Sequence, residues 1–189
     1  MTGSVATWLI IALFPASEIS LWVLKRSNTR DGRDYDRGSL RLLWFAIVFG
    51  VCSAIAFKWL SFGRIHVASH YLNIISFVVI SAGLVVRWVA IFTLGRFFTV
   101  DVAIHGEHSV IASGIYRYIR HPSYSGLLFA FLGLGLSFAS WLSIAVLLVS
   151  ITPAVLNRVI KEEAALRAAL GVPYIDYCAR TKRFIPKLL

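Results

Sequence analysis

The chain has 189 residues, of which 58% are hydrophobic and only 15% charged, and its mean hydropathy is +0.76. An ordinary soluble domain is roughly 45–50% apolar, so this composition argues against a soluble or disordered protein and favours a bilayer. The formal net charge is +10. In so apolar a chain, this excess is typical of cytoplasmic loops rather than of a nucleic-acid binder, and we expect no nucleic-acid partner. Cys52 and Cys178 lie far apart, which predicts neither a disulfide scaffold nor a metal site.

Apolar segments long enough to cross about 30 Å of hydrocarbon recur along the chain. The sequence predicts an all-α integral membrane protein, a single domain over residues 1–189 with five spans. The predicted spans are 5–24, 40–60, 71–95, 123–137 and 140–157. The last two form a tight helical hairpin that turns near Ser137 to Ser140, where Gly133 and Gly135 are small enough to let the two arms approach closely.

Positive charge is distributed unevenly between the predicted loops. Of the 19 Lys and Arg residues, 16 fall in the loop after the first span, in segment 96–122 and in segment 158–187. Because cytoplasmic loops carry the Lys and Arg excess, the N-terminus is expected outside, with a C-terminal helix in the cytoplasm. In a bacterium this would be the inner membrane. Segments 96–122 and 158–187 then lie on the same face and can meet.

Segment 114–124 places two arginines, a histidine and three tyrosines just before the hairpin. Pro122 suits the first helical position, so a helix is expected to begin there, after His121. Its N–H groups and positive dipole end would favour an anion such as a carboxylate. The alternative is that Arg117 and Tyr118 are interfacial anchors.

A second polar group follows the last span. Arg158 and Glu162 are four residues apart and share a face of a helix expected over 141–170, which Gly171 terminates and Pro153 kinks. The alternative is an exposed ion pair. Within the spans, Glu18 and Arg87 are functional candidates, although Arg87 could snorkel to the surface and Glu18 lies near basic residues of the following loop.

Over residues 87–189 the sequence resembles the isoprenylcysteine carboxyl methyltransferase family of integral-membrane methyltransferases. The motifs that carry the resemblance are Leu94-Gly95-Arg96, 107–116, 120–124, Arg158-xxx-Glu162-Glu163, 171–177 and 183–186. Each motif is weak alone, but their order and spacing are specific. The five spans and the hairpin also look like the compact prokaryotic members.

The resemblance implies S-adenosylmethionine as methyl donor. No metal is expected, because the Cys and His residues do not show the spacing of a ligand set. The residues that match cofactor-binding positions are His108, Ser109, Val110, Ile111, Tyr116, His121, Pro122, Ser123, Tyr124 and Glu162. Among them, Glu162 matches the acid that holds the amino-acid end of the cofactor. Arg158 matches the catalytic arginine that faces the methyl acceptor, and Arg183 is assigned a supporting role at the substrate.

The acceptor implied by the resemblance carries an isoprenylcysteine-type carboxylate. This acceptor, a lipophilic small molecule or a prenylated one, would enter the site from the lipid bilayer. A thiol or a phospholipid amine are alternative acceptors within the same class. Outside it, an NADPH-dependent membrane reductase has a related C-terminal architecture, and a non-catalytic scaffold would use the polar residues only as anchors. The spacing of Arg158 and Glu162 favours the methyltransferase.

Overall fold

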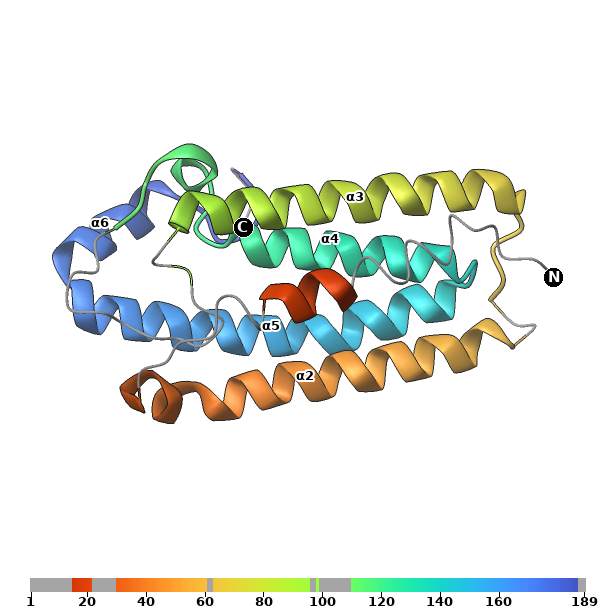
Figure 1. Cartoon of the computed structure of the whole chain (residues 1–189), viewed down its shortest axis with the longest axis horizontal. Helices are drawn as coiled ribbons and strands as arrows, with labels where there is room; N and C mark the ends of the chain where they lie inside the picture. The colour runs from red at the N-terminus through yellow and green to blue at the C-terminus, as the bar shows by residue number, and fades with distance from the viewer. Residues whose placement is uncertain (1–14, 22–29, 61–62, 96–97, 99–109, 187–189) are drawn as a thin grey trace.

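The computed structural model describes residues 15–21, 30–60, 63–95, 98 and 110–186, and within these the ordered elements are helical. A short helical segment over 15–21 precedes α2. The remaining elements are α2 (Arg30–Lys58), α3 (Ser69–Leu94), the 3-10 helix η2 (Gly114–Arg117), α4 (Pro122–Ser137), α5 (Trp141–Leu170) and α6 (Val172–Arg180). The four long helices run along the long axis of the molecule, and α6 lies at one end (Figure 1).

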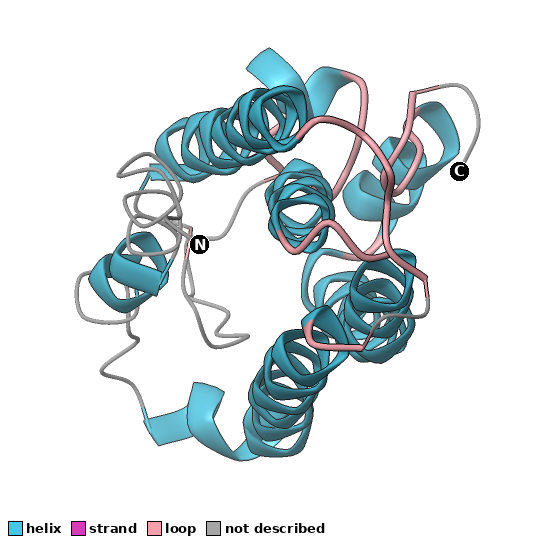
Figure 2. Cartoon of the chain, turned by 90° about the vertical axis from the view of Figure 1, so that its right-hand side faces the viewer, coloured by secondary structure: helices cyan, strands magenta, loops and turns pink. Residues whose placement is uncertain are grey.

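The four long helices pack in pairs, seen end-on in Figure 2. α3 packs against α4, α2 packs against α5, and α4 joins the two pairs by contacting α5. A methyl group on Gly83 would lie 2.6 Å from the backbone of Ala130, and one on Gly126 would lie 2.5 Å from the carbonyl oxygen of Gly83. Only glycine fits at these two positions, so they set how closely α3 and α4 approach.

The hairpin between α4 and α5 confirms the predicted turn. Ser140 is the N-cap residue of α5, and its side chain accepts a hydrogen bond from the backbone nitrogen of Ser143 at 3.3 Å. Gly135 faces Ile144 across the hairpin, as expected. The expectation for Gly133 is wrong, because a methyl group there would lie 2.6 Å from the Ile80 side chain on α3. Gly133 therefore brings α4 close to α3, and the hairpin arms meet through Gly135.

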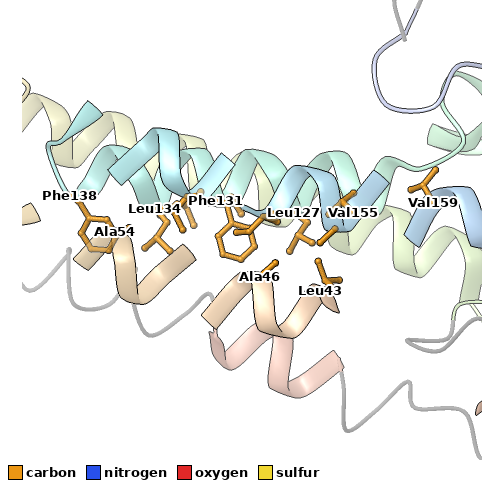
Figure 3. Close-up of a cluster of buried hydrophobic side chains, with 14 residues drawn as sticks. Leu43, Ala46, Ala54, Leu127, Phe131, Leu134, Phe138, Val155 and Val159 are labelled. Atoms are coloured by element: carbon orange, nitrogen blue, oxygen red, sulfur yellow. The ribbon is translucent and has the colours of Figure 1, made fainter. Parts of the chain in front are cut away.

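The core forms where α2, α4 and α5 meet (Figure 3). Phe131, Leu147, Ile151 and Val155 have no exposed surface. The outward faces of the helices are apolar as well: Phe45, Phe92 and Val149 are at least 70% exposed. Such large exposed apolar side chains are typical of helices that face lipid.

Among the described residues, three helices are long and apolar enough to cross a membrane: α2 from Gly38, α3 from His70, and α5. α4 has 16 residues and is about 24 Å long at 1.5 Å per residue, so it is a shorter apolar helix. Most of the predicted first span lies outside the described residues, and the total of five spans stays a prediction. α2 begins at Arg30, ten residues before the predicted span, because a helix continues beyond the hydrocarbon.

The predicted ends of α4 and α5 match the structure. Pro122 is at the start of α4, after the N-cap His121. α5 runs from Trp141 to Leu170 through Pro153 and ends at Gly171, whose φ of 59° lies in the left-handed region that glycine tolerates.

Candidate active site

The start of α4 lies beside the C-terminal segment after α6. The backbone nitrogen of Arg120 donates to the carbonyl of Lys182 at 2.7 Å, and that of His121 donates to the carbonyl of Arg183 at 2.9 Å. The Ser125 hydroxyl adds a 2.9 Å bond to the carbonyl of Phe184. These contacts join parts of the two polar segments, 96–122 and 158–187, that the sequence predicts to meet.

Tyr124, Arg158 and Glu162 form a hydrogen-bonded chain that also reaches α2. The Tyr124 hydroxyl accepts a bond from Arg158 Nε at 2.8 Å and donates one to Glu162 Oε2 at 3.0 Å. Arg158 Nη1 donates to Ser39 Oγ at 3.3 Å. We call Ser39, Tyr124, Arg158 and Glu162 the Glu162 site. Arg158 is only 3% exposed, so the interpretation of this arginine as part of an exposed ion pair is wrong.

Glu163, the next residue, has a different environment. Its carboxylate is 1% exposed and contacts four cationic or titratable side chains. The distances are 3.1 Å to Arg120 Nε, 3.2 Å to His121 Nε2, 3.1 Å to Arg167 Nη2 and 2.8 Å to Arg183 Nη2. We call these five residues the Glu163 cluster. It ties α5 to the start of α4 and to the C-terminal segment.

The Glu163 cluster accounts for two predicted site residues. The ring of His121 and the guanidinium of Arg183 both contact Glu163, and hydrogen bonding to this carboxylate raises the pKa of Arg183. Arg120 also donates to the carbonyl oxygens of Cys178 and Thr181, which fixes the end of α6. Both predicted residues therefore lie in a structural cluster next to the Glu162 site.

Tyr116 on η2 lies close to the Glu162 site. Burial, followed by the nearby Glu162 carboxylate, raises the pKa of Tyr116 above its usual value, so its phenol stays neutral. The backbone carbonyl of Tyr116 accepts a 2.7 Å bond from the Tyr177 hydroxyl, which anchors η2 to α6. Burial likewise raises the pKa of Tyr177, to about 12. η2 is thus held in place by a neutral, buried tyrosine.

The remaining predicted site residues are distributed around the start of α4. Pro122 and Ser123 form its first turn, and Ser123 accepts two bonds from Arg87 Nη1, at 3.0 Å to Oγ and 3.2 Å to its carbonyl oxygen. Val110 and Ile111 are half-buried in the loop before η2. His108 and Ser109 lie outside the described residues.

Several residues of the site were not predicted from the sequence. Glu163 belongs to the motif Arg158-xxx-Glu162-Glu163, but it was assigned no role from the sequence; its spacing of four residues from Arg167 on the same helix was a further usable signal. Ser39 gave none, because its partner Arg158 is 119 residues away. Within the described part of the chain, no group of three His, Cys, Asp or Glu side chains could hold a metal ion.

The fold and this site define a helical membrane protein with a buried arginine, an acid and tyrosines at one end of the bundle. The profile of the isoprenylcysteine carboxyl methyltransferase family matches residues 74–168, and the chain belongs to this family. The match includes α4 and most of α3 and α5, together with Arg158 and Glu162.

Two plant proteins illustrate the relationship. The chain is 31% identical over 118 residues to a probable protein-S-isoprenylcysteine O-methyltransferase of Oryza sativa subsp. indica, covering 61% of this chain and 62% of that protein. It is 32% identical over 111 residues to protein-S-isoprenylcysteine O-methyltransferase A of Arabidopsis thaliana, covering 58% and 56%. The chain thus spans about three fifths of the length of these relatives.

A solved structure shares the fold. The eukaryotic intramembrane Ras methyltransferase ICMT aligns with a TM-score of 0.55 at 23% identity, covering 97% of this chain and 62% of that one. The shared fold therefore extends over nearly the whole of this chain, beyond the region that the family profile matches.

Proposed function

We propose that the chain is an S-adenosylmethionine-dependent methyltransferase that methylates the carboxylate of an isoprenylcysteine-type acceptor. Membership of the family and the names of the two plant relatives support this activity and acceptor. The observation that carries the proposal is the Glu162 site, in which a buried arginine and a half-buried acid share the hydroxyl of Tyr124. Two opposite charges held in this way suit a ligand with groups of both signs.

The residues present fit S-adenosylmethionine, which has an ammonium, a carboxylate and a sulfonium. Glu162 can accept a charge-assisted hydrogen bond from the ammonium, because Tyr124 fixes the orientation of its carboxylate. The faces of Tyr116 and Tyr124 suit a sulfonium. The cofactor would supply a methyl group activated by the positive sulfur.

His121 matches a cofactor-binding position, but its ring already contacts Glu163. We therefore assign the carboxylate of the cofactor to the first turn of α4, where the helix dipole favours an anion. The backbone N–H of Ser123 is the donor available to it, because Pro122 has none and those of Tyr124 and Ser125 donate to the carbonyl of His121. His121 and Arg183 would then hold this turn in place through Glu163. Pro122 contributes its fixed backbone angle at the first helical position.

Arg158 would bind the acceptor carboxylate and orient one oxygen along the attack line. A carboxylate is already a nucleophile, so transfer from a sulfonium requires positioning and exclusion of water rather than a strong base. Bonds to Tyr124 and Ser39 hold the Arg158 side chain from two neighbouring helices. A residue that binds and orients the acceptor needs such support from several elements.

We also propose that the site faces the cytoplasm and that the N-terminus lies outside. The concentration of Lys and Arg in segments 96–122 and 158–187 supports this orientation. α6 and the start of α4 are at the same end of the bundle (Figure 1), which agrees with one polar face. A prenylated acceptor would then enter from the lipid.

Calorimetric titration of the detergent-solubilised chain with S-adenosylmethionine and, separately, with NADPH tests this function. We expect micromolar binding of S-adenosylmethionine, its loss in Glu162→Ala, and no binding of NADPH. Labelled methyl transfer to a farnesylated cysteine, a lipophilic thiol and a phospholipid amine would then identify the acceptor. Binding of NADPH alone, or of neither molecule, would overturn the proposal and point to a reductase or a scaffold.

A further inference from the structure

An ion pair inside the membrane domain connects the 15–21 segment to α3. Arg87 Nε lies 2.7 Å from Glu18 Oε1, and Arg87 Nη2 donates to Glu18 Oε2 at 2.8 Å. The two side chains are only 10% and 15% exposed. The adjacent residue, Trp88, donates from Nε1 to the Ser17 hydroxyl at 2.8 Å. The short N-terminal segment is therefore attached to α3 by two neighbouring polar contacts.

The other side of the Arg87 guanidinium touches the first turn of α4. Nη1 donates to both the hydroxyl and the carbonyl of Ser123. The backbone is equally close, because a methyl group on Gly126 would lie 2.7 Å from the nitrogen of Arg87. The backbone of Arg87 is therefore packed tightly against α4, and two hydrogen bonds to Ser123 hold its guanidinium at the first turn of that helix.

The charge of Arg87 extends into the candidate site. Burial raises the pKa of Tyr116, and the Arg87 charge is among the influences that oppose this rise. Tyr116 and Ser123 both match cofactor-binding positions. The charge of Arg87 acts on Tyr116, and its guanidinium donates a hydrogen bond to Ser123. In a buried environment, a nearby charge is weakly screened.

This positive charge acts on two groups of the ligand in the proposed function. It attracts the carboxylate assigned to the first turn of α4, which S-adenosylmethionine shares with its neutral thioether product, and it repels the sulfonium, which only S-adenosylmethionine has. An unpaired arginine would therefore weaken the binding of S-adenosylmethionine relative to the thioether. The Glu18 carboxylate cancels the charge while leaving Nη1 free to hold Ser123. A neutral residue in place of Arg87 would avoid the repulsion but lose both bonds to α4.

We propose that Glu18 is a positioning residue that acts through Arg87: it neutralises the guanidinium that holds the first turn of α4, so that the site accepts a ligand with a positive sulfonium. This inference rests on the proposed function. It assigns the 15–21 segment a part in the selection of a charged ligand, where a purely structural ion pair would only attach this segment to α3.

The test compares two ligands that differ in charge at one atom. S-adenosylhomocysteine has a neutral thioether where S-adenosylmethionine has a sulfonium, and it is otherwise the same molecule without the methyl group. Affinities for both are measured by calorimetry on the solubilised full chain, for the wild type, Glu18→Gln, Arg87→Gln and the double variant. Glu18→Asp keeps the charge and serves as the matched control.

Glu18→Gln is expected to weaken S-adenosylmethionine roughly tenfold more than S-adenosylhomocysteine, as one uncompensated charge near the sulfonium would. Arg87→Gln shifts the ratio of affinities in the opposite direction, and the double variant returns it to within about twofold of the wild type. Glu18→Asp keeps the wild-type ratio.

If neither single variant changes the ratio, or if both affinities fall by the same factor, the ion pair is structural and the inference is wrong. A wild-type chain that binds neither ligand would instead overturn the proposed function, and this inference with it. The melting temperature without ligand is measured for each variant, which separates loss of folding from loss of charge selection.

Discussion

Glu162 and Glu163 are neighbours on α5, yet their carboxylates lie in opposite environments. Glu163 is 1% exposed and contacts three arginines and a histidine. Glu162 is half-buried and accepts a bond from the hydroxyl of Tyr124. Successive residues of a helix point about 100° apart. Glu163 therefore reaches the C-terminal segment and the residues just before α4, whereas Glu162 reaches Tyr124 within α4.

This difference indicates that the two acids have different roles: Glu163 holds the elements of the site together, and Glu162 binds the ligand. A carboxylate surrounded by cations has little capacity for another and mainly joins the elements that supply them. A carboxylate that accepts one hydroxyl bond retains its charge for a ligand. We therefore expect the Glu163 cluster to govern stability and the Glu162 site to govern binding and turnover.

The largest effect on folding is expected for Glu163→Gln. It leaves Arg120 and His121 buried beside a neutral amide, and loss of one partner from a buried ion pair costs about 3–5 kcal/mol. For a chain of this size we expect the melting temperature in detergent to fall by roughly 10 °C. Asp176→Asn, which removes an exposed acid on α6, is the control and should change it little. If the melting temperature changes equally little in both variants, Glu163 has no structural role.

Arg158→Lys should have the largest effect on turnover. Lysine keeps the charge but cannot make both the Nε bond to Tyr124 and the Nη1 bond to Ser39, so the acceptor loses its orientation. We expect kcat/KM for the prenylated acceptor to fall roughly 100-fold, with S-adenosylmethionine affinity reduced far less. Arg167→Lys, an exposed arginine of the Glu163 cluster, is the comparison. A parallel loss of cofactor affinity in Arg158→Lys would contradict an acceptor role.

Tyr124→Phe tests the hydroxyl that joins Arg158 to Glu162. The ring remains, but both bonds through the hydroxyl are lost, so the orientation of the arginine and of the acid is relaxed. Bonds to charged groups contribute about 1.5–3 kcal/mol, and we expect roughly tenfold weaker cofactor binding and a comparable loss in kcat. Kinetics with wild-type parameters would show that this chain of bonds has no part in the reaction.

The smallest effect is expected for Tyr177→Phe. It removes the hydroxyl that donates to the carbonyl of Tyr116, a single neutral bond worth about 1 kcal/mol. The melting temperature should fall by about 3 °C, and S-adenosylmethionine should bind slightly less tightly because η2 is held less firmly. A fall as large as that of Glu163→Gln would mean that α6, rather than the Glu163 cluster, holds this end of the molecule.

Local chemistry made part of the fold predictable. Pro122 and Gly171 mark helix ends through their own backbone preferences, and the small residues around Ser140 mark the hairpin turn. These signals depend only on a few neighbouring residues, so they can be recognised in a single sequence without a structure. The partner of Gly133 could not be read in the same way, because it depends on which helix α4 packs against.

The site was predictable only where residue types were distinctive. Tyr124, Arg158 and Glu162 stood out through recognisable motifs, and the structure brings them together. Apart from Arg167, which is four residues from Glu163, the partners of Glu163 and of Arg87 lie 20 to 69 residues away in sequence. Polar residues show no periodic pattern from which such distant pairs could be predicted. Arg87 therefore looked able to reach the surface, whereas it is buried against Glu18.

The most direct test of the account compares the two neighbouring acids in one pair of experiments. Glu162→Gln and Glu163→Gln are each titrated with S-adenosylmethionine and melted without ligand. The account predicts that Glu162→Gln weakens binding roughly 10- to 100-fold and changes the melting temperature by no more than a few degrees, while Glu163→Gln mainly lowers the melting temperature. A Glu162→Gln variant that binds S-adenosylmethionine as tightly as the wild type would contradict the central claim.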